Sequence, residues 1–196
     1  MRNDERLRTI YEVMAPYIVR NEHNWRDYLA FASQFHKHSF DNILLVYAQD
    51  EDVSILATRK QWESIGRNLI PRAKGVAVCV YRNAKLTLDY LFDVSQTTGK
   101  EIHPTDWQLS DEMKEALTER LSYAHGFPKQ GFSQALYALA SESVADNYNH
   151  FLQELKQETK GHLFTEIPAG GFEAQYIQLL TDSISYFIGK KCHLPD

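Results

Sequence analysis

Histidines and paired aspartates are the side chains of this chain that could serve metal-assisted hydrolysis, and their spacing supports that chemistry weakly. The zinc-peptidase pattern, two histidines four residues apart with a glutamate between them, is absent. His36 and His38 lie close together with His23 upstream, but no carboxylate or thiol stands at ligand spacing. Asp89 and Asp93 share one face of an expected strand and could hold a divalent ion, although a solvated strand face explains them better. A metal-dependent hydrolase is therefore the least favoured function class.

The other nucleophiles and phosphate-binding patterns of enzymes are equally weak. Cys79 and Cys192 lie in apolar segments, and neither has a neighbouring histidine that would turn it into a thiolate. Gly170 and Gly171 lack the rest of a phosphate-cradling loop. We therefore expect no catalytic residue, no bound metal and no cofactor.

The chain also carries no sign of export or membrane insertion. Four of its first six residues are charged, with no apolar stretch behind them, and no window approaches the roughly 20 apolar residues of a membrane helix. Two free thiols suit a reducing compartment. We expect a cytoplasmic protein without a membrane partner.

The charge of the chain is unevenly distributed. The net charge is −5, from 21 basic and 26 acidic residues. Residues 101–196 carry 7 basic and 14 acidic residues, a balance of −7. Residues 53–100 carry 8 basic residues and only 3 acidic ones. One basic segment in an acidic chain indicates local contact with an anionic partner.

The basic segment combines cations with aromatic residues, as single-strand binding requires. Cations follow the phosphates, and aromatic rings stack on unpaired bases. Arg59 and Lys60 fall in the first turn of an expected helix, where the helix dipole itself attracts anions. The same cations also have structural explanations: solvated side chains, a helical pair of Glu63 with Arg67, and protection of sheet edges. The candidate nucleic-acid-binding residues are Arg59, Lys60, Arg67, Arg72, Lys74, Tyr81, Arg82 and Lys85.

Helical spacing and capping signals predict the elements that precede this segment. One helix is expected from about Asp4 to Met14, ended with the help of Pro16, and two more capped by Asn24 and Ser39. Residues 53–57 are expected to form a strand. Thr58 and Gln61 predict a capping box for a short helix that turns Trp62 and Ile65 inward and ends at Gly66 in the left-handed conformation.

A hairpin and a helical half are expected next. Residues 76–81 and 86–94 read as strands joined through residues 82–85, the second one alternating as a half-buried strand does. Further helices are expected around residues 113–121, from a cap at Ser133, and over 176–188. The prediction is an α+β fold: a small antiparallel sheet with N-terminal helices packed on it, followed by a helical C-terminal half. We expect residues 1–105 to form the first region and residues 106–196 to pack on it.

An ordered series of short matches resembles the amino-terminal domain of ArdC-type antirestriction proteins. Related domains open large polyvalent proteins of bacterial conjugative elements, ahead of helicase and DNA-methylase regions. The matches lie at residues 39–45, 48–49, 57–58, 62, 66–67, 73–76 and 92–97, and the C-terminal half resembles the second group at residues 182–186 and 192.

The resemblance implies a non-catalytic domain that binds single-stranded DNA. It further implies the N-terminal part of a larger mobile-element protein, serving conjugation or antirestriction in the bacterial cytoplasm, with downstream domains as partners. In ArdC-type proteins a zinc-peptidase-like domain follows, and its motif is missing here.

The chain departs from the family pattern at two loops. Residues 49–52 read Gln-Asp-Glu-Asp where relatives tend to have Gln-Arg-Pro-Asp, which removes a cation. Arg72 stands where relatives tend to have glycine, which adds one. The matched residues Asn42, Gln49 and Gln96 serve turns and caps as readily as ligand contacts. A docking module without DNA binding is the alternative function, and it predicts an exposed apolar patch and no salt-sensitive binding.

Overall fold

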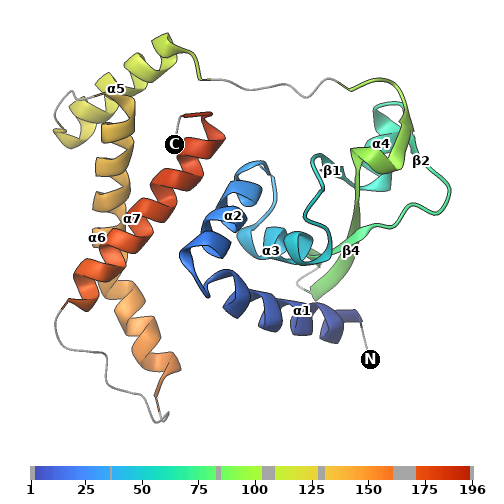
Figure 1. Cartoon of the computed structure of the whole chain (residues 1–196), viewed down its shortest axis with the longest axis horizontal. Coiled ribbons are helices and arrows are strands. Elements are labelled where there is room, and N and C mark those ends of the chain that lie inside the picture. The colour runs from blue at the N-terminus through green and yellow to red at the C-terminus, as the bar shows by residue number, and fades with distance from the viewer. Residues whose placement is uncertain are drawn as a thin grey trace. The chain divides into compact units, whose positions relative to one another are not determined.

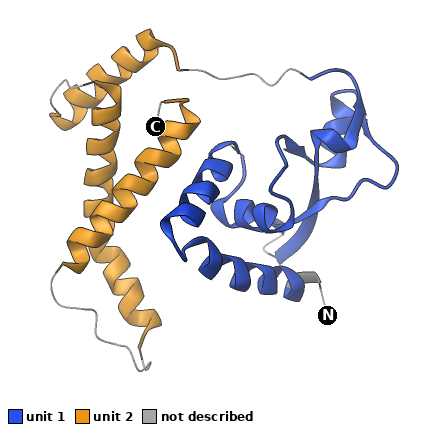
Figure 2. Cartoon of the chain, in the orientation of Figure 1, with its two compact units in different colours: residues 1–106 blue, residues 107–196 orange. Residues whose placement is uncertain are grey.

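The computed structural model describes residues 3–35, 37–82, 85–102, 109–127, 131–160 and 171–194. The chain divides into two compact units, residues 1–106 and 107–196 (Figure 2). The first combines helices with small sheets and the second contains helices, so the predicted α+β class is confirmed (Figure 1). No helix in the described ranges is both long and apolar enough to cross a membrane.

Three helices begin the first unit: α1 (Asn3–Ile18), α2 (Glu22–Ser33) and α3 (Phe40–Gln49). The prediction that Pro16 ends α1 is wrong, because the helix continues one turn further and buries Ile18 to 3% exposure. The predicted cap of α2 is also wrong: Asn21 accepts the N–H of Asn24 at 2.9 Å, one turn earlier than expected. Ser39 caps α3 as predicted, accepting from the N–H of Asn42.

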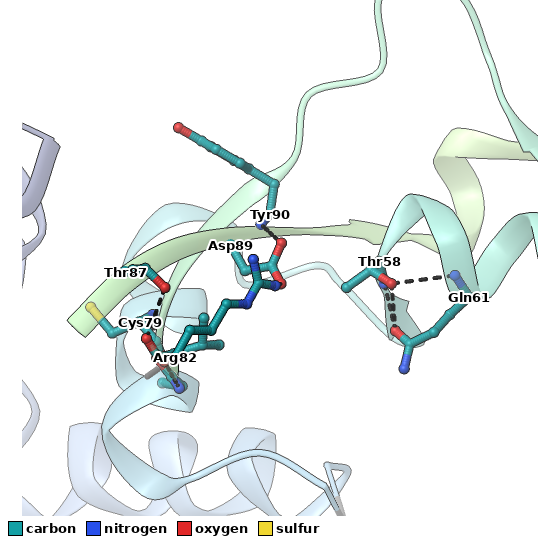
Figure 3. Close-up of polar contacts among 9 residues, drawn as sticks. Thr58, Gln61, Cys79, Arg82, Thr87, Asp89 and Tyr90 are labelled. Carbon is teal, nitrogen blue, oxygen red and sulfur yellow. Dashed lines mark hydrogen bonds and ion pairs between the residues drawn. The ribbon is translucent and has the colours of Figure 1, made fainter. Parts of the chain in front are cut away.

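The short helix α4 (Arg59–Ser64) begins with the predicted capping box. The Thr58 hydroxyl accepts the Gln61 N–H at 3.3 Å, and Gln61 Oε1 accepts the Thr58 N–H at 2.8 Å (Figure 3). Trp62 is buried as predicted and donates its indole N–H to the Phe92 carbonyl at 2.8 Å. Ile65, expected inside, is 48% exposed, because Gly66 at φ 83° ends the helix directly after it. The core therefore holds α4 through Trp62.

The sheets are small and antiparallel. Strands β3 (Val76–Arg82) and β4 (Lys85–Asp93) form a hairpin, and β1 (Leu56–Ala57) pairs with the end of β4, giving the order β1-β4-β3. A separate pair joins β2 (Arg67–Leu69) to β5 (Thr97–Gly99), with the 3-10 turn η1 (Val94–Gln96) between β4 and β5. The predicted strand over 53–57 is reduced to β1, although Val53 is buried.

Two side-chain amides of α3 close the outer edge of β3. Asn42 accepts the Cys79 N–H at 2.8 Å and donates to the Cys79 carbonyl at 2.7 Å. Gln49, two turns further along α3, does the same with Ala77 at 3.0 and 2.9 Å. Each amide replaces the partner that a neighbouring strand would supply. Asn42 and Gln49 are therefore structural, which leaves ligand contact to other residues.

Helices α5 (Asp111–His125), α6 (Phe132–Glu158) and α7 (Phe172–Lys191) make up the second unit. Helix α6 packs along α7, where the Phe151 and Tyr176 rings stack with their centroids 4.4 Å apart. Gly131 precedes α6 without any side-chain cap, so the predicted cap at Ser133 is wrong. Packing against α7 stabilises a helix of 27 residues without a capping side chain.

Candidate nucleic-acid interface

The two faces of the β3–β4 hairpin differ sharply in burial. Strand pairing sets Val76 opposite Leu91 and Val78 opposite Asp89, so these residues share one face. Val76, Val78 and Leu91 are at most 6% exposed. The other face, here called the open face, consists of Ala77, Cys79, Tyr81, Leu86, Leu88, Tyr90 and Phe92.

The open face exposes aromatic and aliphatic side chains. Tyr81 is 79% exposed, Leu86 55% and Tyr90 44%. Figure 3 shows Tyr90 and Arg82 on opposite sides of the β4 ribbon. The alternation in β4 was predicted correctly, but its polar set lies on the buried side and its apolar set faces out. Because apolar strand residues normally turn inward, this exposed row is a candidate binding surface.

Asp93 explains how the polar side of β4 can be buried. Its carboxylate accepts N–H bonds from Ser54 at 2.8 Å, Ile55 at 3.0 Å and Ser95 at 2.9 Å. Burial alone would raise its pKa, but these hydrogen bonds outweigh burial and hold the pKa below its usual value. The expectation that Asp93 lies on a solvated face is wrong: it is 5% exposed and ties β1 and η1 to β4.

Phe92 forms one end of the open face against Gly75. A Cβ at Gly75 would lie 2.9 Å from Phe92 Cζ and 3.0 Å from Tyr90 Cβ, so the Phe92 ring packs directly over the glycine backbone. The Arg59 guanidinium lies over the Phe92 ring, 6.0 Å from its centroid. The capping box places Arg59 at the first position of α4. An aromatic ring and a cation are thus brought together from distant parts of the sequence.

A turn with an unusual residue leads into β3 beside Gly75. The Ala73 N–H donates to the Ile70 carbonyl at 3.2 Å, with Pro71 second in the turn and Arg72 third. Arg72 has φ 66°, the left-handed conformation that a type II β-turn requires at its third position and that glycine adopts most easily. Arg72 therefore places a cation in this turn at a cost in backbone strain.

The seven cations among the predicted binding residues divide into three groups. Arg59, Lys60, Arg72, Lys74 and Lys85 are exposed and have no carboxylate within ion-pair distance among the described residues. Arg82 is 2.5 Å from the Asp89 carboxylate, and strand pairing places it with Lys85 on the face opposite Tyr81. Arg67 donates to the Thr97 hydroxyl at 2.7 Å, to the Thr97 carbonyl at 3.0 Å and to the Lys100 carbonyl. Arg67 therefore holds β2 to β5.

The structure brings together Tyr81 and the rings of Tyr90 and Phe92, of which only Tyr81 was a predicted site residue. The strand alternation was the signal that could have found the other two, because residues 81, 90 and 92 must share a face once the hairpin register is set. Gly75 was also missed, since a lone glycine before a strand shows its role only through the ring that it contacts.

The metal alternative gains no support. Among the described residues, no group of three or more histidine, cysteine, aspartate or glutamate side chains is placed to hold a metal ion. Asp89 faces Arg82 and Asp93 is occupied by backbone N–H groups. His36 lies outside the described residues, while burial lowers the pKa of His38. Burial likewise raises the pKa of the Cys79 thiol, which disfavours the thiolate.

Comparison with known proteins finds no match for the chain among protein-family models, curated proteins or solved structures.

Proposed function

We propose that the open face of the hairpin binds single-stranded nucleic acid. The observation that carries the proposal is the exposure of Tyr81 and Tyr90 on the same sheet face as Phe92. An aromatic row on a sheet, bordered by cations without ion-pair partners, is the arrangement that stacks unpaired bases and follows their phosphates. Duplex bases are already stacked on each other, so such a face discriminates against duplex.

The dimensions of the face suit a short stretch of one strand. From Phe92 to Leu86 the face extends along β4 for about 20 Å, the distance over which six stacked nucleotides extend. Arg59 lies at the Phe92 end, and Gly75 links that end to Arg72 and Lys74 one to three residues earlier. Phosphate contacts are therefore concentrated at the Phe92 end.

The resemblance to ArdC-type domains supports DNA as the natural ligand. We further propose, on that resemblance, that the chain acts without catalysis as the N-terminal part of a larger mobile-element protein. Its role there would be equilibrium association with a DNA strand exposed during conjugation or antirestriction.

The direct test is fluorescence anisotropy with a labelled single-stranded DNA of about 25 nucleotides, longer than the site of one small domain. The matching duplex is measured alongside, each at two salt concentrations. We expect the single strand to bind more tightly and its affinity to fall steeply with salt, because phosphate contacts release counterions. Absence of binding to the single strand at low salt would contradict the proposal.

Protein docking is the second candidate for the same face, and the exposure of Leu86 favours it. A leucine contributes apolar area but no ring for a base. Leu86→Gln therefore separates the two functions. It should leave DNA affinity nearly unchanged if bases stack on the tyrosines. If the face docks onto a protein, the same substitution should abolish binding of that protein.

A further inference from the structure

Helix α5 in the second unit exposes three large apolar side chains and buries two hydroxyl side chains. Met113 is 45% exposed, Leu117 38% and Tyr123 94%, whereas Thr118 and Ser122 are each 8% exposed. The Thr118 hydroxyl donates to the Lys114 carbonyl at 2.7 Å, and the Ser122 hydroxyl is buried without a partner among the described residues. Helices in proteins gain most of their stability by packing an apolar face against a neighbour. Among the described residues, nothing covers Met113, Leu117 and Tyr123 of α5 in this way.

The exposed apolar residues lie on one side of α5, with the exposed Arg120 among them. Successive helical residues are about 100° apart, so Met113, Leu117 and Ala124 fall within about 40° of one another. Arg120 follows directly beside Met113, and Ala116 and Tyr123 lie beyond it on the same side. Thr118 and Ser122 fall on the opposite side, where His125 Nδ1 lies 2.7 Å from Glu142 Oε2 of α6. The outer stripe, as it is called below, consists of Met113, Ala116, Leu117, Tyr123 and Ala124.

The outer stripe is bordered by acidic residues. The same spacing places Glu112, Glu115 and Glu119 within about 60° of one another, directly beside Tyr123 and Ala116. A surface hollow of about 500 Å³ lies at this border, lined by Ala116, Glu119, Arg120, Tyr123 and Ala124.

We propose that the outer stripe of α5 docks an amphipathic helix of another protein, with lysine or arginine along the border that meets the glutamates. The periodic apolar stripe matches helix-on-helix packing. Its three exposed apolar side chains amount to roughly 300–400 Å², the size at which surface patches are often functional. The three glutamates outnumber the one cation of this surface, Arg120, so the surface favours a basic partner by charge complementarity.

The charges also argue against the other occupants. In an antiparallel pair of α5 helices from two copies, the same border of each helix meets, so glutamates would face glutamates. The balance of −7 over residues 101–196 opposes both self-association and contact with nucleic acid or anionic lipid.

The test uses a labelled synthetic peptide of about 18 residues, five helical turns, with leucines at heptad a and d positions and lysines on both borders. Two control peptides accompany it: the same composition scrambled, and the same leucine stripe with glutamate in place of lysine. Binding of each to the whole chain is followed by anisotropy. We expect saturable binding of the basic helix alone, weakening as salt is added.

Two variants locate the site. Leu117→Gln with Tyr123→Gln removes the apolar contacts from exposed positions and should weaken binding by about tenfold or more. Glu115→Lys with Glu119→Lys should reverse the preference, so that the glutamate-bearing peptide binds and the lysine-bearing one does not. Glu154→Lys with Glu158→Lys on α6 is the matched control, with the same spacing, exposure and change of charge, and should leave the preference unchanged. Circular dichroism checks that each variant keeps its helices.

Three results would overturn the proposal. One is equal binding of the scrambled and helical lysine peptides, or no binding of either. Another is an unchanged preference in Glu115→Lys with Glu119→Lys. The third is dimerisation of the chain in sedimentation that Leu117→Gln with Tyr123→Gln abolishes, since the outer stripe would then be an interface between copies.

Discussion

The open face of the hairpin and the outer stripe of α5 share one construction and carry opposite charge. In both, the periodicity of the element is regular but its apolar side faces out: Tyr81 and Tyr90 on the strands, Leu117 and Tyr123 on the helix. Arg59 lies over Phe92 at one end of the first, and three glutamates lie beside the second. We infer from the comparison that an exposed apolar row is a candidate binding surface, and that the charge beside it predicts the chemistry of the partner.

The largest expected effect comes from removing the rings of the open face. Tyr81→Ala with Tyr90→Ala should weaken single-strand binding by at least about 30-fold, because each lost stacking contact costs about 1–3 kcal/mol. Thermal stability should change little, since both side chains are exposed. Tyr123→Ala is the matched control, an exposed tyrosine on the acidic surface, and should leave DNA affinity unaltered. Equal losses in the two variants, measured by anisotropy, would remove the distinction between the surfaces.

The next effect concerns the buried side of the same strand. Asp93→Ala should lower the free energy of unfolding by about 2–3 kcal/mol, because three buried N–H groups lose their acceptor. Urea unfolding followed by tryptophan fluorescence measures it. Glu63→Ala, at an exposed carboxylate of α4, is the control and should change stability by less than about 0.5 kcal/mol.

The pKa of Asp93 gives this prediction a pH dependence. Its folded-state pKa lies below the unfolded value of about 3.9, so its contribution is fully present above that value and is lost as the pH falls through the folded pKa. The difference in stability between the wild type and Asp93→Ala should therefore shrink in acid below about pH 4. A difference that stays constant down to the lowest accessible pH would show that folding does not lower the pKa of Asp93.

A smaller effect should follow from the cation over Phe92. Arg59→Gln should weaken binding to all single strands by about three- to tenfold and reduce the salt slope by about one, as the loss of one phosphate contact does. Arg8→Gln on α1 makes the same change at a cation paired with Glu12 and serves as the control. A salt slope that Arg59→Gln leaves unchanged would place Arg59 outside the interface.

The smallest effect has opposite signs for stability and binding. Arg72→Gly relieves a left-handed arginine and should stabilise the fold by up to about 1 kcal/mol, while lowering DNA affinity about two- to fivefold. Thermal unfolding and anisotropy measure the two. A variant that binds as well as the wild type would mean that Arg72 contributes only to the turn.

Local signals in the sequence predicted the helices and strands better than they predicted how these elements pack. Ser39, Thr58 and Gly66 act within one helical turn, so their roles follow from neighbouring residues. Pro16 was misjudged because burial of Ile18 in the next turn depends on tertiary packing. Alternation in β4 predicted which residues share a face, but which face is buried depends on Asp93 finding donors from residues 54, 55 and 95.

The candidate site could be predicted only in part for the same reason. The basic segment was evident in the sequence, and within it the structure places Arg59 over the Phe92 ring and exposes Tyr81. The structural use of Arg67 could not be inferred, because its acceptors at Thr97 and Lys100 are 30 and 33 residues away. The sequence pattern of α5 likewise gives helical spacing without revealing that the apolar side is exposed.

Ultraviolet crosslinking of a bound single strand, followed by mass-spectrometric mapping of the attached peptides, tests the central claim most directly. The account predicts crosslinks within residues 76–93, at the tyrosines of the open face, and none on α5. Crosslinks concentrated on α5, or spread over both units without preference for the hairpin, would contradict it.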